Sequence, residues 1–325
     1  MSCYYAFNGD ADGLCALQQL RLAAPRGIAP AAPVTLVTGV KRDIQLLRRI
    51  DAGPGDEVTV LDVSLDSNRA DLLRLLDSGA RVHYFDHHYA GDLPLHTGFT
   101  PHIDESPEVC TSLLVDRHLG GRYRAWAIVA TFGDALAKVG HALASGFKAD
   151  EVAILRQLGT YLNYNAYGET VADLHFDPAD LAAQMLPFAE PLDFVRHSPA
   201  YAQLAAGYHS DMAQARQLAP IRQLPGATLM LLPDACWARR VTGVFANELR
   251  QAQPDHALAI LSPKACGAFS VSVRVPNLSP VSAEAFCRTF DTGGGRKLAA
   301  GINHLPQADV ERFIARFEER FGSGS

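Results

Sequence analysis

The sequence predicts an α/β fold in two domains, the first of which is built on a parallel β-sheet. In the first third of the chain, short apolar runs alternate with segments of helical periodicity, which is the pattern of β-α-β units. Prolines then interrupt the segment from 187 to 226, and a second α/β pattern follows it. We therefore expect a domain over residues 1–186, a helical, proline-containing linker over 187–226 and a smaller α/β domain over 227–325.

The elements of the first domain follow from its apolar runs and helical spacing. The expected strands are Cys3–Phe7, Val34–Val40, Glu57–Leu61 and Arg81–Phe85. The expected helices are Leu14–Ala23 and Arg69–Leu76, and a long helical region is expected over Tyr123–Val139. More helix is expected up to about residue 187. Within it, Tyr161–Tyr167 is compatible with lining the cleft or with packing the helical region, and packing is favoured.

The second domain shows both periodicities clearly. Residues Phe269–Val275 alternate between apolar and polar, as in a strand with one buried face. The last segment, Val310–Phe321, repeats apolar residues along one helical stripe. The remaining expected elements are the strands Thr228–Leu232 and Ala257–Leu261, which flank a helix over Val241–Gln251.

Composition restricts the class of protein. The formal net charge of −6 argues against a general nucleic-acid coat protein. No apolar run approaches the roughly 20 residues of a membrane span, and the N-terminus lacks the basic region of a signal peptide. The six cysteines show no CxxC or zinc-type spacing, which is typical of reduced thiols. We therefore expect a cytoplasmic protein.

Acidic residues follow three of the predicted strands. The first strand leads into Asp10 and Asp12, the third into Asp62, and the fourth into Asp86-His87-His88. The carboxyl ends of parallel strands share one edge of a sheet, where ligands bind. Carboxylates gathered there repel one another unless a cation lies between them. Oxygen and imidazole ligands suit Mn²⁺, Fe²⁺ or Zn²⁺, and the near absence of cysteine argues against a structural zinc site.

Each of these pieces alone also has an ordinary structural interpretation. An Asp-x-Asp-Gly sequence is commonly a turn or a helix cap, and an aspartate after a strand is commonly an N-cap. Adjacent histidines also occur in loops. Their joint occurrence at three strand ends is what favours metal binding.

The motifs resemble those of the DHH–DHHA1 superfamily of phosphoesterases. Phe85-Asp86-His87-His88 matches its DHH motif, and Gly9-Asp10-Ala11-Asp12-Gly13 looks like its first motif in the form seen in RecJ-like exonucleases. Asp62 stands where the aspartate of the second motif belongs. Thr131-Phe132-Gly133-Asp134 looks like the fourth motif, and only this resemblance singles out Asp134, which otherwise reads as a polar residue on an amphipathic helix.

A second signature lies near the C-terminus. The run from Gly293 through Gly294, Gly295, Arg296 and Lys297 to Gly301 resembles the glycine-rich signature of the DHHA1 domain. Three consecutive glycines allow close approach of a ligand, and their amides are expected to form a nest that holds phosphate oxygens. Ser272-Val273-Arg274 resembles the Ser-x-Arg element of the family, and Ser272, Arg274 and Arg296 are expected to bind substrate.

The chain departs from the family pattern at two positions. The histidine usual in the last signature is Arg296 here, which puts substrate specificity in doubt. Many members also carry a histidine just before the first aspartates, where this chain offers only Ala6 or Asn8. One metal is therefore expected to be held more weakly, with water or Asn8 in that place.

The resemblance implies a mechanism that uses two Mn²⁺ ions, with Mg²⁺, Co²⁺ or Fe²⁺ as alternatives. Asp62 would bridge the ions, Asp10 would bind mainly one of them, and Asp12, His87 and Asp134 would bind the other. A bridging water would become hydroxide and attack phosphorus. Asp86 would orient a histidine, and His88 would contact the phosphate or protonate the leaving oxygen. The C-terminal domain would close over the cleft, with the linker as hinge.

The favoured function is a phosphodiesterase that cleaves short oligonucleotides or dinucleotides to 5′-mononucleotides. A 3′-phosphoadenosine-5′-phosphate phosphatase, a cyclic-dinucleotide phosphodiesterase and an exopolyphosphatase use the same chemistry and stay open. A nucleotide-binding regulator with lost or slow hydrolysis is the alternative of a different class. A Rossmann-type oxidoreductase is excluded because no GxGxxG follows the first strand. Long double-stranded nucleic acid and membranes are not expected as partners, and a homodimer is compatible with the sequence.

Overall fold

The computed structural model describes residues 1–24 and 33–323, which form two compact units. The first unit is Met1–Ala206 and the second is Gly207–Ser325. The division falls within the range 187–226 and inside helix α9 (Pro199–Ala215). That range also contains α8 (Pro191–His197). No helix within the described residues is long and apolar enough to cross a membrane.

The first unit contains a five-stranded, wholly parallel sheet with the order β2-β1-β3-β4-β5. The strands of this sheet are β1 (Cys3–Phe7), β2 (Val34–Val37), β3 (Glu57–Leu61), β4 (Arg81–Asp86) and β5 (Phe99–Ile103). The α/β fold predicted from the sequence is confirmed. The strand order reverses direction between β1 and β3, and a crevice opens at such a switch point beyond the carboxyl ends of the strands.

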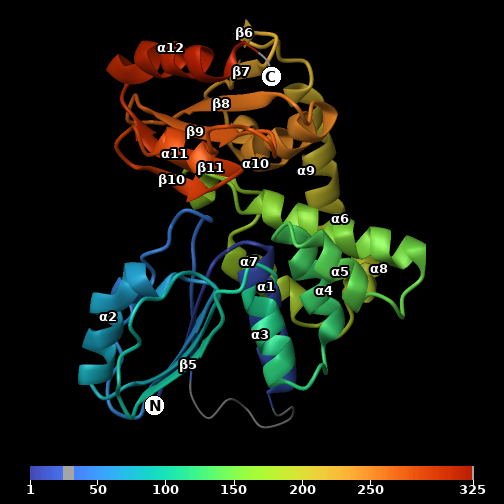
Figure 1. The fold of residues 1–325 in the computed structure, drawn as a ribbon. Helices are drawn as coiled ribbons and strands as arrows, with labels where there is room; N and C mark the ends of the chain where they lie inside the picture. The colour runs from blue at the N-terminus through green and yellow to red at the C-terminus, as the bar shows by residue number, and fades with distance from the viewer. Residues whose placement is uncertain (25–32, 324–325) are drawn as a thin grey trace. The chain divides into compact units, whose positions relative to one another are not determined.

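Helices cover both faces of this sheet. Figure 1 shows α2 on one side of it and α1 with α3 on the other. Alternate strand residues such as Val60 and Tyr84 pack with Leu72 and Leu75 of α2 in one apolar core. The helices of this unit are α1 (Ala11–Ala23), α2 (Leu65–Asp77), α3 (Thr111–His118), α4 (Arg124–Gly133), α5 (Ala137–Leu143), α6 (Ala149–Asn165) and α7 (Pro178–Met185), with short 3₁₀ turns at Leu47–Arg49 and Val171–Asp173.

The helical region predicted over Tyr123–Val139 consists of two helices, α4 and α5, because the chain leaves the helical conformation after Gly133. Ala135 has a φ of 62°, a left-handed conformation that an alanine adopts only under tertiary constraint. The predicted strand Val34–Val40 also ends early, at Val37. Strand β5, with a proline and a histidine among its five residues, was not predicted.

The second unit contains a six-stranded mixed sheet with the order β10-β11-β9-β8-β7-β6, in which only β7 and β8 are parallel. Helix α12 buries Phe313 and Phe317 on one face of the sheet, where both rings contact Phe286 edge-on. The strands are β6 (Arg222–Gln223), β7 (Ala227–Leu231), β8 (Ala257–Pro263), β9 (Phe269–Arg274), β10 (Gly293–Arg296) and β11 (Ala299–Leu305). The helices are α10 (Cys236–Ala252), α11 (Ala283–Cys287) and α12 (Val310–Phe321), with a 3₁₀ turn at Gln307–Asp309.

Candidate metal centre

Asp10 caps the first helix. It follows β1 in extended conformation, and its Oδ1 accepts hydrogen bonds from the backbone amides of Asp12 (3.0 Å) and Gly13 (3.2 Å). A Cβ at Gly13 would lie 2.1 Å from the carbonyl oxygen of Asn8, so only glycine lets α1 start this close to the end of β1. The local sequence therefore holds the Asp10 carboxylate at the strand edge.

Asp12 points from the first turn of α1 towards the start of α3. Its two oxygens accept the backbone amides of Thr111 (2.7 Å) and Ser112 (2.8 Å), and its side chain is buried. A carboxylate suits the orphan amides at a helix N-terminus. Asp12 thus joins two helices while its Oδ2 stays 3.9 Å from His87 Nε2.

Asp62 is a buried carboxylate on a strained backbone. It directly follows β3 and has a φ of 59°, a conformation that is uncommon outside glycine and that is found often at functional sites. Its Oδ1 lies 3.4 Å from the Thr111 hydroxyl, which donates to it. Burial raises the pKa of the Asp62 carboxyl well above its ordinary value, and the carboxylates of Asp10 and Asp12 raise it further.

The two histidines after β4 are directed differently. His87 Nε2 lies 3.3 Å from Asp62 Oδ1, 3.9 Å from Asp12 Oδ2 and 4.0 Å from Asp134 Oδ2. Burial alone would lower the pKa of His87, but the carboxylates of Asp62, Asp12 and Asp134 outweigh it and raise the pKa to about 10. In the described structure His87 is therefore an imidazolium placed among three acids.

Asp86 fixes the second histidine. It is fully buried, and its Oδ1 lies 2.7 Å from His88 Nδ1 while also accepting the backbone amides of His87 (2.9 Å) and His88 (3.3 Å). Its Oδ2 accepts the amide of Leu65 at 3.3 Å. Because Nδ1 is engaged, the His88 ring has only Nε2 available for a ligand, and this side chain is 40% exposed.

The break between α4 and α5 releases Asp134 into the cluster. Its Oδ2 is buried and has no hydrogen-bond partner among the described residues. Burial and the nearby Asp12 raise the pKa of its carboxyl. A Cβ at Gly133 would lie 2.4 Å from the Cβ of Ala11, so glycine allows α4 to approach α1 and bring Asp134 to the centre.

The donor set fits a divalent cation. Ligand atoms bound to one ion at about 2.1 Å lie about 3 to 3.5 Å from one another, which is close to the 3.3–4.0 Å between His87 Nε2 and its three carboxylate neighbours. Ligand atoms of Asp62, His87 and His88 also lie within 4.8 Å of one another. A buried carboxylate oxygen without a partner is costly unless an ion satisfies it, and Asp134 supplies such an oxygen.

Lys41 is the residue of this cluster that the sequence reasoning missed. Its ammonium forms an ion pair with Asp10 Oδ2, donates to Asn163 Oδ1 at 3.3 Å and lies 5.8 Å from the centre of the Tyr167 ring. Burial opposes the charge, but Asp10 raises the pKa of Lys41 well above its ordinary value. Lys41 follows β2, and a basic residue just after a predicted strand is the signal in the sequence that points to it.

The segment Tyr161–Tyr167 packs the helical region and also borders the acidic cluster. Tyr161 and Tyr164 are buried and pack the helical region as predicted. Asn163, however, accepts from Lys41 and so borders the acidic cluster. The expectation that this segment only packs is therefore incomplete.

The residues predicted to bind substrate in the second unit lie on β9 and β10, which are separated in the sheet by β11. Arg274 ends β9 and donates from Nη1 to Ser272 Oγ at 2.9 Å. Arg296 is exposed at the end of β10. The predicted phosphate nest is wrong: Gly293–Gly295 lie in β10, which pairs antiparallel with β11, and only Gly295 among them has a positive φ. Extended backbone does not turn successive amides towards one point, as a nest requires.

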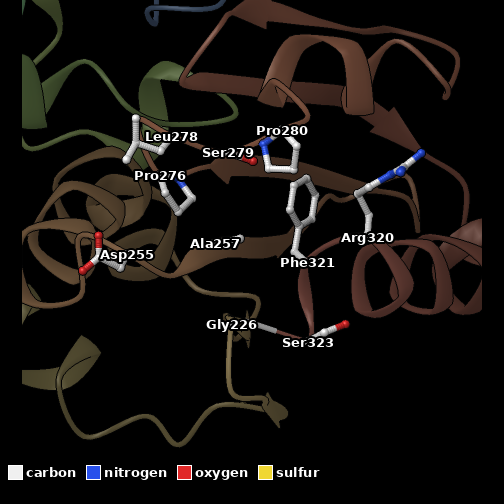
Figure 2. A pocket seen from close by; sticks show the side chains of 10 residues that line it. All are labelled: Gly226, Asp255, Ala257, Pro276, Leu278, Ser279, Pro280, Arg320, Phe321 and Ser323. Atoms are coloured by element: carbon white, nitrogen blue, oxygen red, sulfur yellow. The ribbon is translucent and has the colours of Figure 1, made fainter. Parts of the chain in front are cut away.

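A separate cavity of about 270 Å³ lies in the second unit. Its lining includes Pro276, Leu278 and Phe321, and Figure 2 shows Asp255 and Arg320 on opposite sides of it. None of the residues predicted to bind substrate lines this cavity. It is therefore not part of the predicted site.

No family model and no curated protein matches the sequence, whereas solved structures match along nearly the whole chain. Exonuclease RecJ bound to manganese shares 21% identity with a TM-score of 0.63, covering 98% of this chain and 89% of that chain. The DHH domain of a member of a family of ribosomal proteins shares 12%, with a TM-score of 0.63 and coverage of 98% and 86%. The pGpG-specific phosphodiesterase PggH from Vibrio cholerae shares 13%, with a TM-score of 0.56 and coverage of 97% of each chain. The shared two-unit α/β fold confirms the fold expected from the motifs.

Proposed function

We propose that this chain, which has the fold of the DHH–DHHA1 superfamily, is a divalent-metal-dependent phosphoesterase. The single observation that carries the proposal is the convergence of Asp12, Asp62 and Asp134 on His87 Nε2, with a buried oxygen of Asp134 left without a hydrogen-bond partner among the described residues. The likeness to RecJ and PggH, which act on nucleic acid and on pGpG by their names, supports it.

Asp12, Asp62, His87 and Asp134 would hold the ion, and Mn²⁺ is the proposed metal. When bound, a divalent ion supplies Lewis acidity towards a phosphate oxygen and lowers the pKa of a coordinated water. The mixed carboxylate and imidazole donor set suits Mn²⁺ as well as Fe²⁺ or Zn²⁺. Asp10, the remaining predicted ligand, forms an ion pair with Lys41.

His88 is proposed to serve the leaving group. Asp86 accepts a hydrogen bond from Nδ1, which fixes the tautomer with Nε2 free to accept or donate a proton. The partial exposure of this ring lets a substrate oxygen approach Nε2. His88 would therefore contact the phosphate or protonate the leaving oxygen.

The proposed substrates are short oligonucleotides or dinucleotides, cleaved to 5′-mononucleotides. Arg274 with Ser272 and Arg296 would bind a further phosphate or the nucleotide, since guanidinium groups pair with phosphate bidentately. The net charge of −6 agrees with a small substrate recognised at a site and not with a long nucleic acid bound along a basic surface.

A second candidate is a nucleotide-binding regulator with lost or slow hydrolysis. The observation that favours it is the composition of the first strand end, where Asn8 stands in place of a histidine and Asp10 is already paired with Lys41. Such a protein would bind the ligand and the metal but turn over slowly.

Turnover separates the two functions. Metal-stripped protein would be incubated with and without Mn²⁺ against an RNA dinucleotide, 3′-phosphoadenosine-5′-phosphate, a cyclic dinucleotide and a polyphosphate chain. We expect mononucleotide release from the dinucleotide only with Mn²⁺. If none of the four compounds is hydrolysed while one of them still binds, the result would favour the regulator.

The matched variants are Asp62→Asn and Asp77→Asn. Asn tolerates the left-handed conformation of position 62, so this change removes the charge and leaves the backbone unstrained. Asp77 is an exposed aspartate at the end of α2 and serves as the control. We expect Asp62→Asn to lose about 10³-fold or more in activity, in the range of other electrostatic groups at active sites, and Asp77→Asn to lose none. Full activity in Asp62→Asn would exclude the proposed site.

A further inference from the structure

Both oxygens of Asp10 are occupied by groups of this chain. Oδ1 accepts two backbone amides at the N-terminus of α1, those of Asp12 and Gly13. Oδ2 forms an ion pair with the ammonium of Lys41. The Asp10 side chain is 4% exposed, so its negative charge is compensated by groups of the protein and not by solvent. Asp10 thus already has a cation beside it.

Lys41 is held in this position by contacts on both its backbone and its side chain. Its backbone amide donates to the carbonyl of Ala166 at 2.9 Å, and its own carbonyl accepts Asn8 Nδ2 at 3.5 Å. Its Nζ also donates to Asn163 Oδ1 at 3.3 Å. These contacts come from the end of α6 and the end of β1, so the ammonium is placed by the fold and not by the flexible stem alone.

Three other acids gather around His87, and one of them, Asp62, also lies close to Asp10. Among the described residues, the carboxylates within 4.0 Å of His87 Nε2 are those of Asp12, Asp62 and Asp134, and Asp10 is not one of them. These three acids surround His87 Nε2 at 3.3–4.0 Å. The oxygen of Asp134 that no described residue satisfies belongs to one of these three acids.

We propose that Lys41 takes the place of a second metal ion, so that the chain binds one divalent cation, at Asp12, Asp62, His87 and Asp134, with a fixed ammonium beside Asp10. The inference rests on the proposed function, because it concerns how many ions the proposed centre holds. It replaces the two-ion arrangement expected from the sequence motifs by one ion and one lysine.

The ligands left for a second ion are poor. Beside Asp10, the side chain at the end of β1 is Asn8, whose buried Oδ1 has no hydrogen-bond partner within the described part of the chain. An amide oxygen is uncharged, so it attracts a divalent ion less strongly than a carboxylate does. A second ion would also have to displace the Lys41 ammonium from Asp10 or lie next to it, and like charges that close repel strongly in a buried site.

The number of ions can be counted without measuring activity. Metal-stripped protein would be dialysed to equilibrium against saturating Mn²⁺, and manganese per chain would be measured by elemental analysis. Electron paramagnetic resonance on the same samples distinguishes isolated Mn²⁺ from an exchange-coupled pair. Lys41→Met removes the charge but keeps the apolar stem, and Lys148→Met, at an exposed lysine of the same unit, is the control.

We expect one Mn²⁺ per chain with an isolated-ion signal in the wild type and in Lys148→Met. Lys41→Met should take up a second ion and show a coupled signal, and the double variant Lys41→Met/Asp10→Asn should return to one. Two ions in the wild type, or one ion in both the wild type and Lys41→Met, would overturn the role of Lys41 while leaving the phosphoesterase proposal standing. No bound Mn²⁺ in any variant would overturn both.

Discussion

His87 Nε2 lies 3.3 Å from Asp62 Oδ1, although the two residues are separated by a helix in the sequence. The parallel pairing of β3 with β4 sets Leu61 opposite Phe85. Asp62 and His87, which follow these two residues, therefore lie at the same edge of the sheet. Burial and neighbouring carboxylates raise the pKa of Asp62, and Asp62 in turn raises the pKa of His87. The metal-free pair therefore holds a proton that a cation must displace.

Cation binding is accordingly expected to release protons. Because the pKa of His87 is raised to about 10, the imidazole is protonated at pH 7 and must lose its proton to bind a metal. At least one proton should leave per Mn²⁺ bound at pH 7, and the apparent affinity should rise about tenfold per pH unit up to about pH 9. Calorimetric titrations in buffers of different ionisation enthalpy measure this release.

The raised pKa of His87 also makes the stability of the metal-free protein depend on pH. The folded pKa of His87 lies above the ordinary value of 6.5, so its stabilising contribution in the metal-free protein is complete below about pH 6.5 and is lost as the pH rises towards 10.

Two variants control the proton-release experiment. His87→Gln should abolish the proton release, whereas His141→Gln, at an exposed histidine, should not. Equal binding enthalpies in all buffers would contradict the protonated state of His87.

Asp62→Asn is expected to stabilise the metal-free protein while it removes activity. The substitution takes away one of several buried carboxylates that repel one another, as the raised pKa of Asp62 indicates. A gain of 1 kcal/mol corresponds to about 2 to 4 °C in melting temperature for a unit of this size. Asp62→Ala should gain less, because alanine at a φ of 59° is strained by about 1 kcal/mol or more. Thermal unfolding without metal compares the two variants, and a lower melting temperature for Asp62→Asn than for the wild type would argue against repulsion.

Gly133→Ala should displace Asp134 from the centre. The new methyl group would meet the Cβ of Ala11 at 2.4 Å and the carbonyl oxygen of Gly159 at 3.1 Å, so α4 must move away from α1. Such overpacking costs about 1 to 3 kcal/mol, and we expect Mn²⁺ affinity to fall at least tenfold. Gly146→Ala meets nothing within 4 Å and should change neither quantity. Urea unfolding and metal titration measure both variants, and equal metal affinity in the two would mean that α4 does not position Asp134.

Two adjacent glycines of β10 should lose very different amounts of stability when each is replaced by alanine. A Cβ at Gly293 would lie 1.8 Å from the carbonyl oxygen of Cys287, whereas one at Gly294 meets nothing within 4 Å. Gly293→Ala should therefore destabilise the second unit by about 1 to 3 kcal/mol, and Gly294→Ala by no more than about 0.5 kcal/mol. If Gly294→Ala instead left stability unchanged but greatly raised KM, the edge of β10 would contact substrate closely.

Asp86→Asn tests the positioning of His88. The Asp86 carboxylate accepts from His88 Nδ1 at 2.7 Å, and an amide in its place can favour the other tautomer. We expect kcat to fall about 10- to 100-fold with KM little changed. A parallel loss of kcat and of thermal stability would indicate a structural role alone.

Much of the site was determined by the sequence. Strands Cys3–Phe7 and Glu57–Leu61 were predicted with the bounds they have, because short buried parallel strands are continuous apolar runs. The amphipathic stripe of α12 was equally clear from its period. Since parallel strands end at one edge, the approach of Asp62 to His87 followed from the order of the elements alone.

Tertiary structure decided the features that depend on contacts between distant segments. The break after Gly133 releases Asp134 because α4 packs against α1 and α6, which helical periodicity cannot reveal. The glycines of β10 are extended because β11 pairs with them, whereas the same letters are compatible with a nest. Lys41 meets Asp10 only because the loop after β2 is fixed to Ala166 and Asn8. A sequence shows which groups a strand edge can offer, but which of them neutralise one another depends on distances that only the folded chain sets.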